Sequence, residues 1–200
     1  MIVPFKHTHF GWEFGDKVGG FRLHSGVDLN YGAPYADQGL DVKVIADGQV
    51  VYSENTGAGW GNLMVVYHPK HRVWSRYAHL EKRFYHTGAQ VKEGDVIGTC
   101  GSTGGNWSSH LHFDIIIKKL PKWTNYTRGW SQKKLREYYI DPLPFIEGVN
   151  KVVEPEWQQK TREWAETVLE DVDGFVENMT PWKVLELVRK ATNRKATNKK

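Results

Sequence analysis

The segment from residue 42 to residue 118 is a succession of short β-type runs joined by tight turns, and no helical periodicity interrupts it. Its clearest turn is Asp47-Gly48, which lies between the runs Val42–Ala46 and Gln49–Tyr52 and favours a hairpin, because both turn residues tolerate positive φ. The other main runs are Leu63–His68, Val73–Leu80 and His110–Lys118. Strands at this spacing, without helices between them, predict an antiparallel all-β domain.

The sequence divides into a principal domain and a C-terminal appendage. A chain of 200 residues with 40% apolar residues can form one domain with a substantial core. We place this domain at residues 1–150 and expect within it a long loop with a short helix near Ser131–Tyr139. Residues 151–190 carry apolar side chains at helical spacing and are predicted to form a two-helix extension, followed by a basic solvated tail at residues 191–200.

Positive charge is concentrated outside the β-type body. Residues 1–117 carry 10 Lys and Arg against 11 Asp and Glu, whereas residues 118–140 carry 7 against 1. We call residues 118–140 the basic insertion. Lysines beside aromatic residues in such a segment favour anionic partners. The net charge of +4 therefore belongs to this insertion and to the tail, and not to the predicted strands.

Cysteine content and hydropathy exclude several classes of protein. The single cysteine, Cys100, rules out an intrachain disulfide framework and cannot by itself build a thiolate metal site. No segment approaches the roughly 20 apolar residues that are needed to cross a bilayer. Residues 1–7 lack the apolar stretch of a signal peptide. We therefore expect no membrane span and no export signal.

Two short histidine-bearing motifs supply groups that can bind or serve a metal. The first contains His24 and Asp28, and it is not the helical zinc signature H-E-x-x-H because the glutamate is absent. The second contains His110 and His112, whose side chains point to the same face if the segment is a strand, while Leu111 turns toward the core. Together the motifs predict a split metal site with four candidate groups.

Further motifs occur in the order that is typical of one known family. They are Phe10-Gly11, His24-x-Gly-x-Asp28, Ile45-Ala-Asp-Gly48, Gly59-Trp-Gly-Asn62, Tyr77-Ala-His-Leu80, Gly101-Ser-Thr-Gly104 and His110-Leu-His-Phe113. Over residues 8–118 the chain resembles the lysostaphin/LytM-type zinc endopeptidases of bacterial cell-wall metabolism. The resemblance implies that residues 1–150 are a zinc metallopeptidase domain, built of antiparallel β-sheets of the barrel-sandwich-like type.

The resemblance also assigns roles to the histidines. It implies that His24, Asp28 and His112 coordinate one Zn²⁺ per chain, and that His110 and His79 act beside it. Three protein ligands leave a zinc position open for water, as in catalytic rather than structural sites. Without the glutamate of H-E-x-x-H, histidines must move the protons. We expect His110 to be the general base and His79 to orient water or to stabilise the oxyanion.

The chain departs from the family pattern around the predicted site. Tyr31–Leu40 is longer than the corresponding family segment and is expected to reshape one wall of the site. The residues before His110 are not glycine-rich, and the loop at residues 101–109 is expected to line the site. We expect Trp107, Ser109 and Trp60 to contact the substrate. Some family members have a tyrosine shortly before the first ligand, and this chain has none there.

The function that these features predict is zinc-dependent hydrolysis of peptide bonds in peptidoglycan stems or cross-bridges. The chain is expected to be a monomer that acts in the bacterial cell wall or outside the cell, with release by lysis or with a phage as candidate routes. A non-catalytic module of the same fold, which binds cell wall or regulates a hydrolase, is the main alternative. A carrier-like module leaves five site residues unexplained, and nucleic-acid binding through the basic insertion is disfavoured because anionic wall polymers would attract the same charge.

Overall fold

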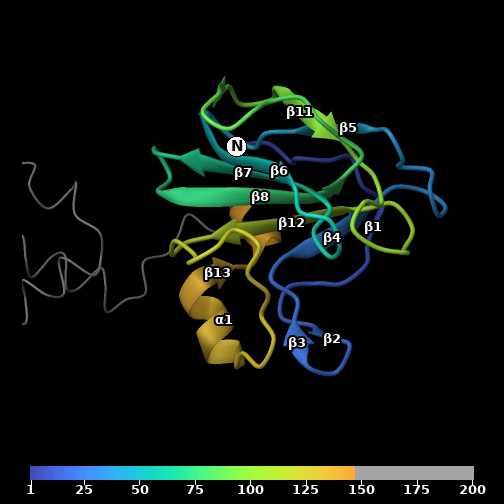
Figure 1. Cartoon of the computed structure of the whole chain (residues 1–200), viewed down its shortest axis with the longest axis vertical. Coiled ribbons are helices and arrows are strands. Elements are labelled where there is room, and N and C mark those ends of the chain that lie inside the picture. Colours follow the sequence, from blue (N-terminus) through green and yellow to red (C-terminus); the bar gives the residue numbers. More distant parts are fainter. Residues whose placement is uncertain (147–200) are drawn as a thin grey trace, which may run out of the picture. The chain divides into compact units, whose positions relative to one another are not determined.

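The computed structural model describes residues 1–146 as an antiparallel β-structure with two sheets, a small hairpin and two short helices (Figure 1). The predictions for residues 151–190 and 191–200 lie outside the described residues. The all-β prediction is confirmed, although the large sheet runs open from β1 to β10 and does not close into a barrel within the described part. No helix of residues 1–146 is long and apolar enough to cross a membrane.

The large sheet has eight strands in the order β1-β4-β12-β8-β7-β6-β10, with β13 beside β12, and a three-stranded sheet has the order β5-β11-β9. The strands are β1 His9–Phe10, β2 Lys17–Val18, β3 Arg22–Leu23, β4 Val27–Asn30, β5 Asp41–Lys43, β6 Gly48–Asn55, β7 Asn62–His68, β8 Val73–Leu80, β9 Lys82–Arg83, β10 Gln90–Val91, β11 Val96–Thr99, β12 Leu111–Ile116 and β13 Tyr139–Ile140. The helices are α1 Gln132–Tyr138 and α2 Pro142–Ile146.

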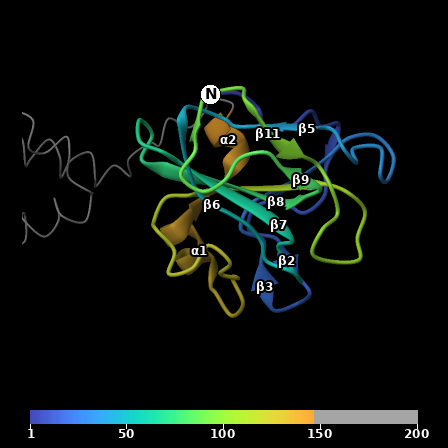
Figure 2. The ribbon, with the colours of Figure 1, turned by 45° about the horizontal axis from the view of Figure 1, so that its top comes forward.

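The two faces of the large sheet are covered differently. The three-stranded sheet lies on one side, and α1 with the β2–β3 hairpin lies on the other (Figures 1 and 2). The side chains of β12 point alternately to these two faces of the sheet. Leu111, Phe113 and Ile115 belong to the main core, whereas Ile116 packs with the hydrophobic cluster beside α1. Since residues i and i+2 of a strand share a face, the even-numbered His112 points toward the α1 side.

The turn at Asp47-Gly48 does not form the predicted hairpin. β5 pairs with β11 in the small sheet, and β6 pairs with β7 and β10 in the large one, so the chain passes from one sheet to the other at this turn. Residues 44–46 are all buried between the two sheets, as Val44, Ile45 and Ala46 are 0%, 0% and 3% exposed. A segment that crosses from one sheet to the other is covered on all sides, so consecutive residues are buried rather than alternate ones.

The predicted strands at residues 63–68 and 73–80 and the predicted short helix are confirmed. β7 and β8 form a hairpin, with His68 paired to Val73 across the turn. The helix predicted near Ser131–Tyr139 is α1, and the Ser131 hydroxyl caps it by accepting a hydrogen bond from the backbone N–H of Lys134 at 3.2 Å. The basic insertion thus runs as a loop into a capped helix and ends in β13.

Gly26 lets the chain before β4 lie directly against β12. A Cβ atom at this position would lie 2.1 Å from the carbonyl oxygen of Phe113 and 2.6 Å from Cβ of Asp114. This glycine therefore lies against the backbone of β12 at Phe113.

Replacing Gly26 with alanine is therefore expected to destabilise the fold, because the obstructing atom is backbone and cannot rotate away. The expected loss is about 3 kcal/mol of unfolding free energy, the upper end of the usual overpacking cost. Thermal denaturation followed by circular dichroism should show a fall in Tm of roughly 6–12 °C. An unchanged Tm would contradict the close approach seen here.

Candidate metal centre

Three neighbouring strands bring the predicted site together at the middle of the large sheet. His112 on β12 is paired with Asp28 on β4 on one side and with Ala78 on β8 on the other. His79 follows Ala78 directly, and His24 lies in the short link between β3 and β4. Motifs that are far apart in the sequence thus meet because their strands are hydrogen-bonded neighbours.

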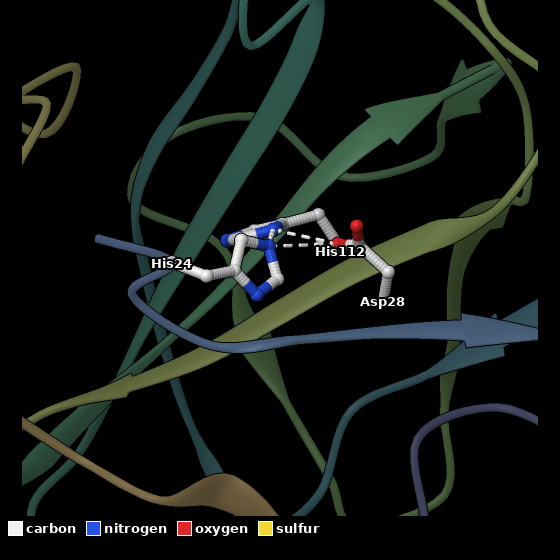
Figure 3. Close-up of side chains that lie close together, drawn as sticks. All are labelled: His24, Asp28 and His112. Atoms are coloured by element: carbon white, nitrogen blue, oxygen red, sulfur yellow. Dashed lines mark hydrogen bonds and ion pairs between the residues drawn. The ribbon is translucent and has the colours of Figure 1, made fainter. Parts of the chain in front are cut away.

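The side chains of His24, Asp28 and His112 point toward one another (Figure 3). His24 Nε2 lies 2.9 Å from His112 Nδ1 and 3.0 Å from Asp28 Oδ1, and His112 Nδ1 lies 2.9 Å from the same carboxylate oxygen. Each residue offers one ligand atom, and all three atoms lie within 4.8 Å of one another. All three residues are buried.

His24 and His112 each have one ring nitrogen that points into the cluster and one that points away from it. The hydrogen bond made by the outer nitrogen determines whether the inner nitrogen carries a lone pair. His24 Nδ1 lies 3.2 Å from the carbonyl oxygen of Glu13, to which it can only donate. His112 Nε2 likewise lies 3.2 Å from the carboxylate of Asp114. The two remaining nitrogens therefore converge as acceptors beside a carboxylate oxygen. Two acceptor nitrogens and one carboxylate form a donor set that suits a zinc ion.

The electrostatics of the centre also favour a cation. Burial alone would raise the pKa of Asp28, but hydrogen bonds and charges from His112 and His24 outweigh it and hold this pKa well below the ordinary value. Burial alone would lower the pKa of His112, yet Asp114 and Asp28 raise it overall. The two carboxylates thus stabilise a proton on the His112 imidazole. A metal cation can take the place of that proton, since ligands bind metals in their deprotonated forms.

His79 lies beside the ligand cluster in a strained backbone conformation. Its φ is 61°, in the left-handed region that residues other than glycine adopt rarely. Two hydrogen bonds hold it there: the backbone N–H donates to the carbonyl of Trp60 at 3.0 Å, and ring Nδ1 donates to the carbonyl of Thr103 at 3.0 Å. Burial, together with His110 and His112, lowers the pKa of His79 to about 3, so that its ring is neutral at physiological pH.

His110 approaches the centre from the start of β12. Its Nδ1 donates to the carbonyl of Ser108 at 2.9 Å, so that the lone pair of the neutral ring lies on Nε2, and Nε2 lies 3.9 Å from Asp28 Oδ2. The rings of His110 and His79 lie 4.8 Å apart between centroids. The structure thus brings all five predicted metal and catalytic residues together.

The three predicted substrate contacts lie in different surroundings. Trp107 is half-buried, and its ring stands edge-on to His79 with centroids 4.9 Å apart. Trp60 is 7% exposed, stacks on Tyr126 at 5.1 Å and donates its indole N–H to the carbonyl of Thr124. The prediction for Ser109 needs correction: it is 1% exposed and its hydroxyl donates to Asp37, so it anchors the segment before His110 and offers no surface to a substrate.

Two charged residues beside the site were not predicted from the sequence. Asp114 and Arg76 form an ion pair of 2.5 Å and are both 0% exposed. The guanidinium of Arg76 also lies 3.9 Å from the ring centroid of Trp60. The position of Asp114, two residues after His112 on a predicted strand, is the one signal that could have revealed it, because such residues share a face.

Comparison with known proteins gives one family. Residues 22–123, about half of the chain, match the profile of Peptidase family M23. The chain is 37% identical over 124 residues to the DD-carboxypeptidase/endopeptidase Mpg of Neisseria meningitidis serogroup B. This alignment covers 60% of this chain and 27% of Mpg. It is 36% identical over 105 residues to the murein hydrolase activator NlpD of Escherichia coli. This alignment covers 52% of this chain and 25% of NlpD. The chain spans about a quarter of the length of these relatives.

One solved structure has a similar fold. The catalytic domain of the antimicrobial peptidase lysostaphin from Staphylococcus simulans is 28% identical and aligns with a TM-score of 0.53, over 70% of this chain and 92% of that domain. The fold of residues 1–146 is thus similar to that of a peptidase catalytic domain.

Proposed function

The chain belongs to Peptidase family M23, and on this basis we propose that it is a zinc-dependent endopeptidase that hydrolyses peptide bonds in the stems or cross-bridges of peptidoglycan. The observation that carries the proposal is the convergence of two acceptor nitrogens and a carboxylate, with two further histidines beside them. A set of three ligands leaves room for water at a zinc ion, as catalytic centres require. The expected content is one Zn²⁺ per chain.

In this proposal the chain's own residues position the reactants and move the protons. His24, Asp28 and His112 would hold the zinc ion. When bound, zinc supplies Lewis acidity, which brings the pKa of a water molecule to about 7 and polarises a peptide carbonyl. His110 is the general base, because the Nδ1 hydrogen bond to Ser108 places the lone pair of the neutral ring on Nε2, which lies 3.9 Å from Asp28 Oδ2.

His79 has a narrower role than the sequence predicts. Because its Nδ1–H donates to Thr103 and its ring is neutral, its Nε2 can accept a hydrogen bond and cannot donate one. We therefore propose that His79 orients the attacking water and does not stabilise the oxyanion. Trp107, beside His79, is the proposed contact for the substrate. The protein would act as a monomer in the bacterial cell wall or outside the cell.

Digestion of purified peptidoglycans tests this function and identifies the bond. Peptidoglycans of several cross-link types would be incubated with the zinc-loaded chain, and the fragments analysed by mass spectrometry. New amino and carboxyl termini at one kind of peptide bond are expected. The absence of new products from every cross-link type would reject the enzyme proposal.

Zinc is expected to bind in a ratio of about one per chain and to be removable by a strong chelator. Metal analysis by mass spectrometry after expression in zinc-supplemented medium would measure the ratio. Hydrolysis should disappear on chelation and return when zinc is added. A chain that contains no zinc after this treatment would defeat the ligand assignment.

A non-catalytic regulator is the second candidate, because one relative is named a murein hydrolase activator. Against it, the chain keeps three candidate ligands and two further histidines around one centre. The two functions differ in a direct assay. A regulator would leave pure peptidoglycan intact and increase the rate at which an added wall hydrolase degrades it, whereas an enzyme releases fragments alone.

Removal of residues 151–200 is expected to preserve activity on soluble wall fragments. Every proposed site residue lies within residues 1–146, and so do the core residues described above. Fragment release by the truncated and full-length chains would be compared by chromatography, with circular dichroism as the control for folding. If the truncated chain cannot fold, the C-terminal segment belongs to the principal domain.

A further inference from the structure

A buried ion pair lies behind His112, on the side of the imidazole that faces away from Asp28. Asp114 Oδ2 lies 3.2 Å from His112 Nε2 and accepts hydrogen bonds from Arg76. It also accepts from the hydroxyl of Ser25 at 3.0 Å. Two charges that are removed from water lose hydration that an apolar pair would not need, so a buried ion pair is weak evidence for stabilisation. Its placement against a candidate ligand suggests another role.

We infer that Asp114, held by Arg76, is a positioning residue for the metal ligand His112. Because His112 Nε2–H donates to Asp114, the imidazole is fixed in the tautomer whose Nδ1 lone pair faces His24 and Asp28. A carboxylate behind a ligand histidine also increases the basicity of the ligating nitrogen. This inference rests on the proposed function, since it concerns the same zinc centre.

Arg76 holds the carboxylate in one orientation. Its Nε and Nη2 both donate to Asp114 Oδ2, at 3.0 and 2.5 Å, and its Nη1 donates to the carbonyl of Trp123 at 2.7 Å. Nη2 also lies 3.4 Å from the hydroxyl of Tyr139, and the guanidinium packs on Trp60. With its donors engaged on several sides, the guanidinium cannot rotate without breaking hydrogen bonds.

The basic insertion therefore contributes to the metal centre through its backbone and its last strand. Trp123 and Tyr139 both belong to residues 118–140, and both contact Arg76. The match to the family profile ends at residue 123, so the Tyr139 contact lies beyond it. In this chain, the insertion closes over the arginine that orients Asp114.

Zinc affinity separates this role from a purely structural one. Affinity would be measured on the full-length chain by competition with a chromophoric chelator, and the absorption spectrum of the Co²⁺-substituted protein would report on ligand geometry. Asp114→Asn removes the charge and keeps the side-chain shape, and we expect it to weaken zinc binding by about 10–100-fold. Asp47→Asn is the control, because Asp47 is an exposed carboxylate paired with Lys92; its zinc affinity should equal that of the wild type.

A second variant covers the case in which Asp114→Asn leaves Arg76 unpaired and does not fold. Arg76→Met combined with Asp114→Leu replaces both charges by apolar groups, a change that buried ion pairs often tolerate. It should weaken zinc binding at least as much as Asp114→Asn does. Wild-type affinity and an unchanged Co²⁺ spectrum in either folded variant would overturn the inference. Failure of both variants to fold would also overturn it, by assigning the pair to the core.

The wild-type measurement separates this inference from the proposed function. If the wild-type chain binds no zinc, the proposed function fails and the inference fails with it. If the wild type binds zinc and the folded variants bind it equally well, the inference fails alone.

Discussion

Replacing His112 with alanine is expected to abolish both zinc binding and hydrolysis. His112 is the central member of the proposed ligand set, since its Nδ1 lies 2.9 Å from His24 Nε2 and from Asp28 Oδ1. Its loss leaves only His24 and Asp28, 3.0 Å apart, of the three proposed ligands. Zinc affinity should fall by more than about 100-fold, the upper figure for changes to residues that only support a ligand. Competition with a chromophoric chelator and release of peptidoglycan fragments would measure the two losses.

The matched control is His86→Ala, which removes an exposed imidazole outside the centre. This variant should retain zinc and activity. Near-ultraviolet circular dichroism of the His112→Ala protein would verify that the fold persists. Full zinc binding by a folded His112→Ala protein would remove His112 from the ligand set.

Replacing His110 with alanine is expected to separate metal binding from catalysis. His110 is outside the three-residue ligand cluster, so the zinc content should remain at about one per chain. Hydrolysis should fall by about 10²–10⁴-fold, the usual contribution of a general base. The measurements are kcat on a defined peptide substrate and metal analysis of the same preparation.

The comparison of His110→Ala with His112→Ala gives this prediction its test. The two residues are separated by one position, and both point toward the centre. Loss of zinc from His110→Ala, with zinc retained in His112→Ala, would show that their roles are exchanged. Full activity of His110→Ala would instead leave His79 as the base.

The motifs alone predict a metal site with four candidate groups, and the family resemblance selects His24, Asp28 and His112 as the proposed ligands. Alternation on a strand places His112 on the face opposite to Leu111, and β12 has this pattern. Which strands lie next to one another is not a local property. Asp47-Gly48 illustrates the difference: the chain bends at Asp47, but the partner of β5 is β11, more than fifty residues along the chain.

The supporting residues were harder to predict than the ligands. Arg76 lies within a β-type run and looks like an exposed arginine in the sequence, because its role depends on Asp114 and Trp123 reaching it from other segments. The strain at His79 is equally invisible, since the carbonyls of Trp60 and Thr103 that hold it come from distant loops. Long-range contacts of single side chains leave no periodic pattern in a sequence.

The contact between Asp37 and Ser109 limits how the loops of this protein could be exchanged. It ties the loop at residues 31–40 to the loop that precedes His110, and two backbone hydrogen bonds between Gly39, Leu40 and Cys100 reinforce the link. Loops around an active site are commonly exchanged one at a time to alter specificity. A transplanted 31–40 loop without Asp37 would remove the anchor of the segment that precedes His110, the proposed base, so the two loops would have to be exchanged together.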